Sequence, residues 1–111
     1  MKAQDIIDEV RRGIHDENAP YKVADELMLQ FVVDGQNDIV SNSTEAATDS
    51  DGTKLTVTDP DNPGATLSIG NEWRSALFKY VAGRSFELKG FDSENRKRAD
   101  KMWERYQKDL M

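Results

Sequence analysis

Few residues of this chain have side chains suited to acid–base or metal chemistry. His15 is the only histidine among the 111 residues, and there is no cysteine. An imidazole can serve as a base or a metal ligand, but no nucleophile or metal partner stands near His15 in the sequence. We therefore expect His15 to lie at a helix end, in contact with carbonyl groups or solvent. The absence of cysteine excludes thiolate chemistry, disulfides and zinc sites built on cysteine.

Two acidic patterns have the spacing of cation sites. Asp34 and Asp38 are four residues apart and would share one face of a helix, as a metal site or an acid–base pair requires. A carboxylate-bridged metal centre in a helical bundle also needs a histidine at i+3, which is missing here. The pattern Asp49-Ser50-Asp51-Gly52 begins like a calcium loop, but Lys54 and Pro60 occupy the EF-hand positions of glycine and glutamate. We expect solvated or inter-subunit carboxylates and no bound metal.

The C-terminal region concentrates positive charge. Trp103 and Tyr106 lie among its cations, so nucleic-acid binding with bases stacked on the rings is one interpretation. Both aromatic residues also fit the apolar stripe of a helix, and acidic residues intersperse the cations, so helix packing is the expected role. A protein–protein contact through the basic flank stays open. The cations are Arg96, Lys97, Arg98, Lys101, Arg105 and Lys108.

The composition favours a soluble domain that assembles with other subunits. Hydrophobic residues make up 37% of the chain and charged residues 32%, and the formal net charge is −6. Residues 1–70 contain 14 acidic and 5 basic residues, whereas residues 71–111 contain 7 and 10. Surfaces of opposite sign can set the register between copies, or they can simply be solvated. The acidity argues against coating of nucleic acid.

No sequence signature of an enzyme is present. The chain contains no glycine-rich phosphate loop, no Ser/His/Asp spacing pattern and no dinucleotide fingerprint. The N-terminus is polar within a few residues, and no apolar run approaches the ~20 residues that span a bilayer. We predict a non-enzymatic protein without a cofactor, a signal peptide or a membrane segment.

Hydrophobic periodicity predicts a mainly α fold, a bundle of about four helices in one domain over 1–111. The helices are expected over about 3–16, 25–40, 71–88 and 92–110. The residues expected to pack are Ile6, Ile7, Val10 and Ile14 in the first helix, Leu27, Met28, Phe31, Val32 and Ile39 in the second, Trp73, Leu77, Tyr80, Val81 and Phe86 in the third, and Ala99, Met102, Trp103, Tyr106 and Leu110 in the fourth.

The segment between the second and third helices predicts a β-hairpin. Residues 55–57 and 66–69 alternate with period two, and the turn-rich stretch 59–64 separates them. We expect a hairpin insertion over about 53–69, preceded by a polar loop. Since an isolated hairpin is marginally stable in water, it would lean on the helices or on a neighbouring subunit.

Gly35 interrupts the apolar stripe of the second helix. A glycine in a helix interior costs about 1 kcal/mol relative to alanine. Close packing of another backbone against Gly35, from the first or third helix, is the simplest compensation. Gly35 is therefore predicted to be a packing residue, together with Phe31, Ile39, Trp73, Tyr80, Trp103 and Tyr106.

Three parts of the chain resemble the small head–tail adaptor (connector or neck) proteins of tailed bacteriophages. The opening Ala3-Gln4-Asp5-Ile6-Ile7-Asp8-Glu9-Val10-Arg11 is similar to their first helix. Asp25, followed by Met28-Leu29, Phe31-Val32 and Asp34-Gly35-Gln36-Asn37-Asp38-Ile39-Val40, is similar to their second helix, although Ala24 and Val33 depart from the usual residues. The third part resembles their closing helical pair and comprises Leu77, Tyr80, Val81, Arg84, Arg98, Ala99 and Tyr106.

The resemblance implies a structural virion protein in the neck, between capsid portal and tail, made in the cytoplasm of a bacterial host. Such proteins form a homo-oligomeric ring, commonly of twelve subunits, beneath the portal protein. The ring extends the channel through which genomic DNA passes without sequence-specific binding, and it offers a platform to the next stopper, tail or nozzle protein. The alternative is a small helical regulatory or binding protein that recognises a host protein or nucleic acid.

In this family the C-terminal helix or tail often contacts the portal. Carried onto this chain, that contact would involve the fourth helix and the C-terminus. The candidate residues are Arg98, Lys101, Arg105, Lys108, Asp109, Leu110 and Met111.

Overall fold

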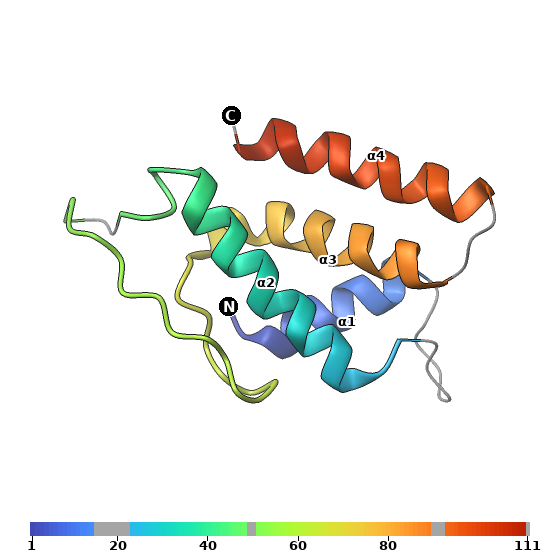
Figure 1. Cartoon of the computed structure of the whole chain (residues 1–111). Coiled ribbons are helices and arrows are strands. Elements are labelled where there is room, and N and C mark those ends of the chain that lie inside the picture. The colour runs from blue at the N-terminus through green and yellow to red at the C-terminus, as the bar shows by residue number, and fades with distance from the viewer. Residues whose placement is uncertain (15–22, 49–50, 90–92, 111) are drawn as a thin grey trace.

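The computed structural model describes residues 1–14, 23–48, 51–89 and 93–110. Four α-helices, α1 (Ala3–Gly13), α2 (Asp25–Asn42), α3 (Arg74–Lys89) and α4 (Ser93–Leu110), account for most of this chain, with a short 3-10 helix, η1 (Asn71–Trp73), before α3 (Figure 1). The predicted mainly helical fold with four helices is confirmed. His15, Asp49 and Met111, which were singled out above, lie outside the described residues.

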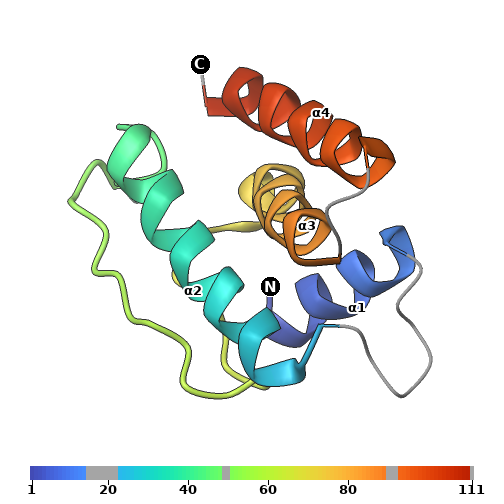
Figure 2. The same cartoon turned by 45° about the vertical axis from the view of Figure 1, so that its right-hand side comes forward.

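Helix α3 lies at the centre of the molecule. It packs against α1, α2 and α4, and α4 runs antiparallel to it on the side away from α1 (Figures 1 and 2). Helices α1 and α2 also pack against each other. Three helices therefore enclose the core, and α4 adds an outer layer over α3.

Local chemistry explains the helix ends. The carboxylate of Asp5 accepts a hydrogen bond of 2.9 Å from the backbone N–H of Lys2, which satisfies a donor at the start of α1. At the end of α2, the Asn42 side chain donates to the carbonyl of Asp38 over 2.8 Å, so α2 extends two residues beyond the predicted 25–40. The predicted start of the third helix at residue 71 forms the 3-10 turn η1, in which the Trp73 N–H donates to the Gly70 carbonyl over 3.1 Å.

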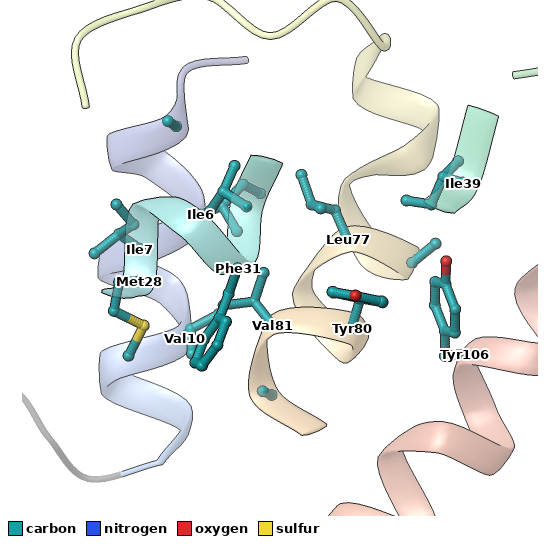
Figure 3. Packing of buried hydrophobic residues seen from close by; sticks show 14 of the residues in the cluster. Ile6, Ile7, Val10, Met28, Phe31, Ile39, Leu77, Tyr80, Val81 and Tyr106 are labelled. Carbon is teal, nitrogen blue, oxygen red and sulfur yellow. The ribbon is translucent and has the colours of Figure 1, made fainter. Parts of the chain in front are cut away.

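The apolar stripes expected from the sequence meet in one core. The buried side chains include Ile6, Ile7 and Val10 of α1, Met28, Phe31 and Ile39 of α2, Leu77, Tyr80 and Val81 of α3, and Tyr106 of α4 (Figure 3). Burial of each large aliphatic side chain contributes about 1.5–3 kcal/mol before entropy is counted. One expected packing residue differs: Leu27 is 37% exposed, because it lies at the edge of the α2 stripe.

The β-hairpin predicted over 53–69 is wrong. Residues 53–69 contain no strand, and the bridges in the described chain are isolated ones that join Lys2 to Thr66 and Thr48 to Lys54. The two halves of the expected hairpin thus pair with different partners. The Leu67 N–H donates to the carbonyl of Met1 over 2.8 Å, whereas the Leu55 N–H donates to that of Ala47 over 2.7 Å.

Gln36 supplies the physical reason for this difference. Its fully buried side-chain carbonyl accepts the N–H of Ser68 over 2.7 Å, and its amide group donates to the carbonyl of Thr58 over 3.2 Å. The side chain thus occupies the place that a cross-strand ladder would need. Ser68 adds a side-chain contact, since its hydroxyl accepts the Thr58 N–H over 2.9 Å. Residues 58 and 68 are held together by side chains of the insertion and of α2.

Candidate functional site

Three aromatic rings attach α4 to α3. Tyr80 of α3 packs edge-to-face against Trp103 and Tyr106 of α4, with ring centroids 5.2 and 5.4 Å apart. Gly83 makes room for this contact, because a Cβ atom there would lie 3.0 Å from Cε2 of Trp103. Edge-to-face pairs of this kind contribute about 0.5–1.5 kcal/mol beyond their buried area. The aromatic residues predicted for packing therefore form the joint between the core and its outer helix.

Polar contacts fix the position of α4 on the joint. The hydroxyl of Tyr106 donates to the carboxylate of Asp38 in α2 over 2.5 Å. Burial raises the pKa of Tyr106 well above its usual value, and the hydrogen bond to Asp38 raises it further. The indole N–H of Trp103 donates to Glu87 over 2.6 Å, and this contact fixes the rotation of the ring.

The portal-contact candidates divide into two groups. Arg98, Lys101, Arg105 and Lys108 are exposed and recur at helical spacing, so they share one flank of α4. The second group lies in the last turn: Asp109 forms a 2.6 Å ion pair with Lys79 of α3, and Leu110 is half-buried.

The basic flank of α4 is the side that faces away from α2. The opposite flank meets α2 at a shallow depression of about 310 Å³, lined by Asp38, Asn42, Tyr106, Gln107 and Leu110. On the basic flank, Arg98 pairs with Glu94 over 2.7 Å and Lys108 with Glu104 over 3.7 Å. Lys101 and Arg105 form no ion pair with any residue that the structure describes. The flank therefore offers uncompensated positive charge to a partner.

The predicted carboxylate pair of α2 serves two separate contacts. Asp34 accepts a hydrogen bond of 2.9 Å from Gln30 and lies 3.8 Å from the guanidinium of Arg84, whereas Asp38 binds Tyr106. Within the described parts of the chain, no three His, Asp or Glu side chains gather as a metal ion would require. Both carboxylates thus act in attaching helices to one another.

Arg84 lies at the base of an open groove between α2 and α3. Its guanidinium donates to the hydroxyl of Tyr80 over 2.9 Å and stacks over the ring of Phe31, 4.8 Å from the centroid. The groove, of about 320 Å³, is lined by Leu27, Phe31, Arg84, Glu87 and Leu88. Leu27 and Leu88 are the most exposed large hydrophobic side chains that the structure describes. The groove leaves apolar surface open to solvent.

Gly35 lies against side chains of α3. A Cβ atom at this position would be 2.6 Å from Cδ1 of Leu77 and 2.8 Å from Cδ1 of Tyr80. The close approach expected at Gly35 thus comes from two packed side chains of the third helix, and not from another backbone. The absence of a side chain at Gly35 leaves room for Tyr80, whose ring packs against Trp103.

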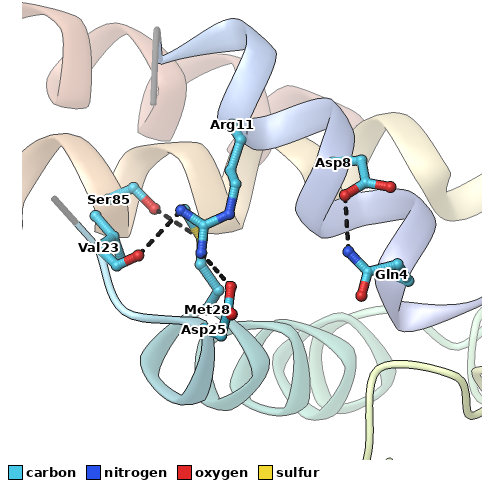
Figure 4. A network of polar contacts seen from close by, with 7 residues as sticks. All are labelled: Gln4, Asp8, Arg11, Val23, Asp25, Met28 and Ser85. Atoms are coloured by element: carbon cyan, nitrogen blue, oxygen red, sulfur yellow. Dashed lines mark hydrogen bonds and ion pairs between the residues drawn. The ribbon is translucent and has the colours of Figure 1, made fainter. Parts of the chain in front are cut away.

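Buried polar residues were missed by the sequence reasoning. Arg11 is only 4% exposed; it donates to the Val23 carbonyl over 3.0 Å and to the Asp25 carboxylate over 2.6 Å, and so ties α1 to the start of α2 (Figure 4). The spacing of Arg11 could have indicated its burial, since it lies four residues after Ile7 and continues the apolar stripe of α1. Gln36 likewise lies on the stripe of α2.

A third buried polar residue lies in α3. The hydroxyl of Ser85 donates to the carbonyl of Val81 over 2.8 Å and lies 3.7 Å from the sulfur of Met28 (Figure 4). Its small size lets α2 and α3 approach each other closely at this point.

No protein family, curated protein or solved structure was found to match the chain. Among the described residues, no helix is both long and apolar enough to cross a bilayer.

Proposed function

We propose that this chain is a structural virion protein, a head–tail adaptor of a tailed bacteriophage that forms a ring beneath the portal. The proposal rests on the resemblance of three sequence segments of this chain to helices of those proteins. Two of the three segments fall in α1 and α2, and the third in α3 and α4, so they belong to elements that pack on one another. In a ring we expect a neighbouring subunit to cover Leu27 and Leu88, the exposed leucines beside the groove.

In this proposal the three-helix core is the ring body and α4 is the outer layer. The last turn of α4, with Lys108 and Leu110, faces the portal. The net charge of −6 suits a conduit, because an acidic wall repels phosphates and lets DNA slide. The ring of about a dozen subunits would present its other side to a stopper, tail or nozzle protein.

Electron microscopy of the chain mixed with the portal protein tests this role. The expected result is a ring of about a dozen copies on the portal. Deletion of residues 108–111 should abolish portal binding while the helical circular dichroism signal is retained. Lys54→Ala is the control, since Lys54 is an exposed cation of the insertion and not of α4. Unchanged portal binding by the deletion variant contradicts the contact, and the absence of any ring contradicts the role.

A second candidate function rests on the basic flank of α4. Four exposed cations on one helix flank also suit a small regulatory protein that binds an acidic host protein or nucleic acid. This function predicts a salt-sensitive complex with short DNA or with a host protein, and no ring with the portal.

A further inference from the structure

A row of cations without ion-pair partners among the described residues runs along α4 and shares Lys101 and Arg105 with the basic flank. Lys97, Lys101 and Arg105 follow one another at intervals of four residues and are exposed. None of them is ion-paired with any part of the chain that the structure describes. Successive members are about 6 Å apart along the helix axis. This basic row lies on the side of α4 that faces away from its contacts with α3.

An acidic turn lies at the opposite end of the molecule. Asp59 and Asp61 are exposed on either side of the buried Pro60. The turn is held in place from α2, because the Asn37 side chain donates to Asp59 over 2.9 Å and Gln36 binds the neighbouring Thr58. The segment passes below α2 and the start of α1, whereas α4 lies at the top in both views (Figures 1 and 2).

We propose that the basic row of one copy binds the acidic turn of a second copy. The spacing is compatible, since alternate residues are at most about 7 Å apart and successive cations of the row about 6 Å. A second copy is the partner to which we assign the row, because the chain itself presents two exposed carboxylates at a spacing that matches two exposed cations of the row. The acidic turn supplies the complementary charge at short range.

The placement of the two surfaces determines the type of assembly. Because the basic row and the acidic turn lie on opposite sides of the molecule (Figures 1 and 2), we infer that two copies make one such contact and that each copy keeps one surface free for the next. The result is a head-to-tail contact, which closes into a ring or continues as a filament. The inference deepens the proposed adaptor role and rests on it for ring closure. It assigns Lys101 and Arg105 to the contact between copies and leaves the portal to the last turn of α4.

The test mixes two variants that each lack one surface. Full-length Lys101→Gln/Arg105→Gln and Asp59→Asn/Asp61→Asn are prepared and examined by sedimentation velocity at low ionic strength. We expect self-association of the unaltered chain, weakened at least about tenfold in each variant and also by added salt. An equimolar mixture of the two variants should give 1:1 dimers that do not grow, because the pair has one intact row and one intact turn.

The matched control is Arg12→Gln/Lys54→Gln, which removes two exposed cations outside the basic row. It should self-associate like the unaltered chain. Circular dichroism of each variant establishes that the helices are retained.

Several outcomes contradict the proposal: an unaltered chain that stays monomeric at low salt, variants that associate normally, or a mixture without dimers. If the Lys101→Gln/Arg105→Gln variant loses binding to short DNA but self-associates normally, the basic row is a nucleic-acid surface and the proposal is wrong. If every variant still forms rings on the portal, the adaptor role stands and this interface is wrong. If association follows the charges but no ring forms on the portal, the interface stands and the adaptor role is wrong.

Discussion

The core formed by α1, α2 and α3 differs from the outer helix α4 in how it is held. Large apolar side chains from three directions fill the core, and many of them are fully buried. Among the α4 side chains whose burial is described, only Ala99 and Tyr106 are buried. Attachment of α4 therefore depends on the aromatic joint and on polar contacts to Asp38, Glu87 and Lys79. Apolar packing therefore provides most of the stability, whereas directional contacts determine where α4 lies.

The largest expected effect comes from truncating a buried side chain in the core. Leu77→Ala should lower the free energy of unfolding by about 2–5 kcal/mol, because Leu77 is fully buried and its truncation leaves a cavity. Urea unfolding followed by circular dichroism measures the change. Leu27→Ala is the matched control: the same atoms are removed at a side chain that is 37% exposed, and we expect a loss of less than about 1 kcal/mol. Equal losses would show that the core is misassigned.

Overpacking at Gly35 should be the next largest effect. Gly35→Leu places a side chain where Leu77 and Tyr80 already lie, and should cost about 1–3 kcal/mol in urea unfolding. Because Tyr80 supports Trp103, the change should also alter tryptophan fluorescence, which would link the core to the joint. Ser41→Leu, at an exposed position of the same helix, is the control and should have little effect. Normal stability of the Gly35 variant would refute close packing there.

Alkaline pH should weaken the joint specifically. Burial raises the pKa of both Tyr80 and Tyr106 in the folded protein, whereas the unfolded chain ionises near the usual value of about 10. The folded state therefore binds more protons above pH 10. The stability contribution is fully present below pH 10 and is lost as the pH rises towards the folded pKa values. Above pH 10, each tyrosine that stays neutral in the folded protein but ionises in the unfolded chain should lower the free energy of unfolding by about 1.4 kcal/mol per pH unit.

Tyr106→Phe separates the hydroxyl from the ring. At pH 7 we expect a loss of about 1.5 kcal/mol, since one hydrogen bond to a charged, partly exposed acceptor is removed while the ring packing remains. Above pH 10 the unfolding free energy of the variant should fall less steeply than that of the unaltered chain. Identical slopes in urea unfolding at pH 10–11 would show that Tyr106 does not titrate on unfolding.

The smallest expected effect concerns the ion pair at the end of α4. Lys79→Gln removes the partner of Asp109, and the loss should lie between 0 and about 1 kcal/mol, because both side chains remain partly in contact with water. The loss should shrink further in 1 M salt. A loss above 2 kcal/mol would mean that the last turn of α4 is held more firmly than the aromatic joint.

The helices could be predicted from the sequence because each has its own apolar period. The stripe Ile6, Ile7 and Val10 and its counterpart around Leu77 identify buried faces without knowledge of the partner helix. The fourth helix was predictable for the same reason. The division of its surface residues into a basic flank and a last turn held against α3 could not be predicted. The ion pair of Asp109 depends on Lys79, which lies thirty residues earlier in the chain.

The insertion was mispredicted because its partners are distant in the sequence. The alternation of residues 55–57 and 66–69 is a local signal, and it favours a hairpin. The competing contacts come from Gln36 and from Met1, which a local pattern does not contain. The hydrogen bonds of Arg11 and Gln36 could not be predicted, because their partners Val23, Asp25, Thr58 and Ser68 lie in other segments of the chain.

The N-terminal backbone has a further consequence for synthesis of the chain. The N–H groups of Ala3 and Gln4 donate to the carbonyls of Ala65 and Pro63, and the carbonyl of Met1 accepts from Leu67. These contacts of residues 1–4 therefore form only after a segment about sixty residues later in the chain has been synthesised. Loop closure of that length slows folding relative to local helix formation. The start of α1 must remain unanchored until residues 63–67 have been synthesised.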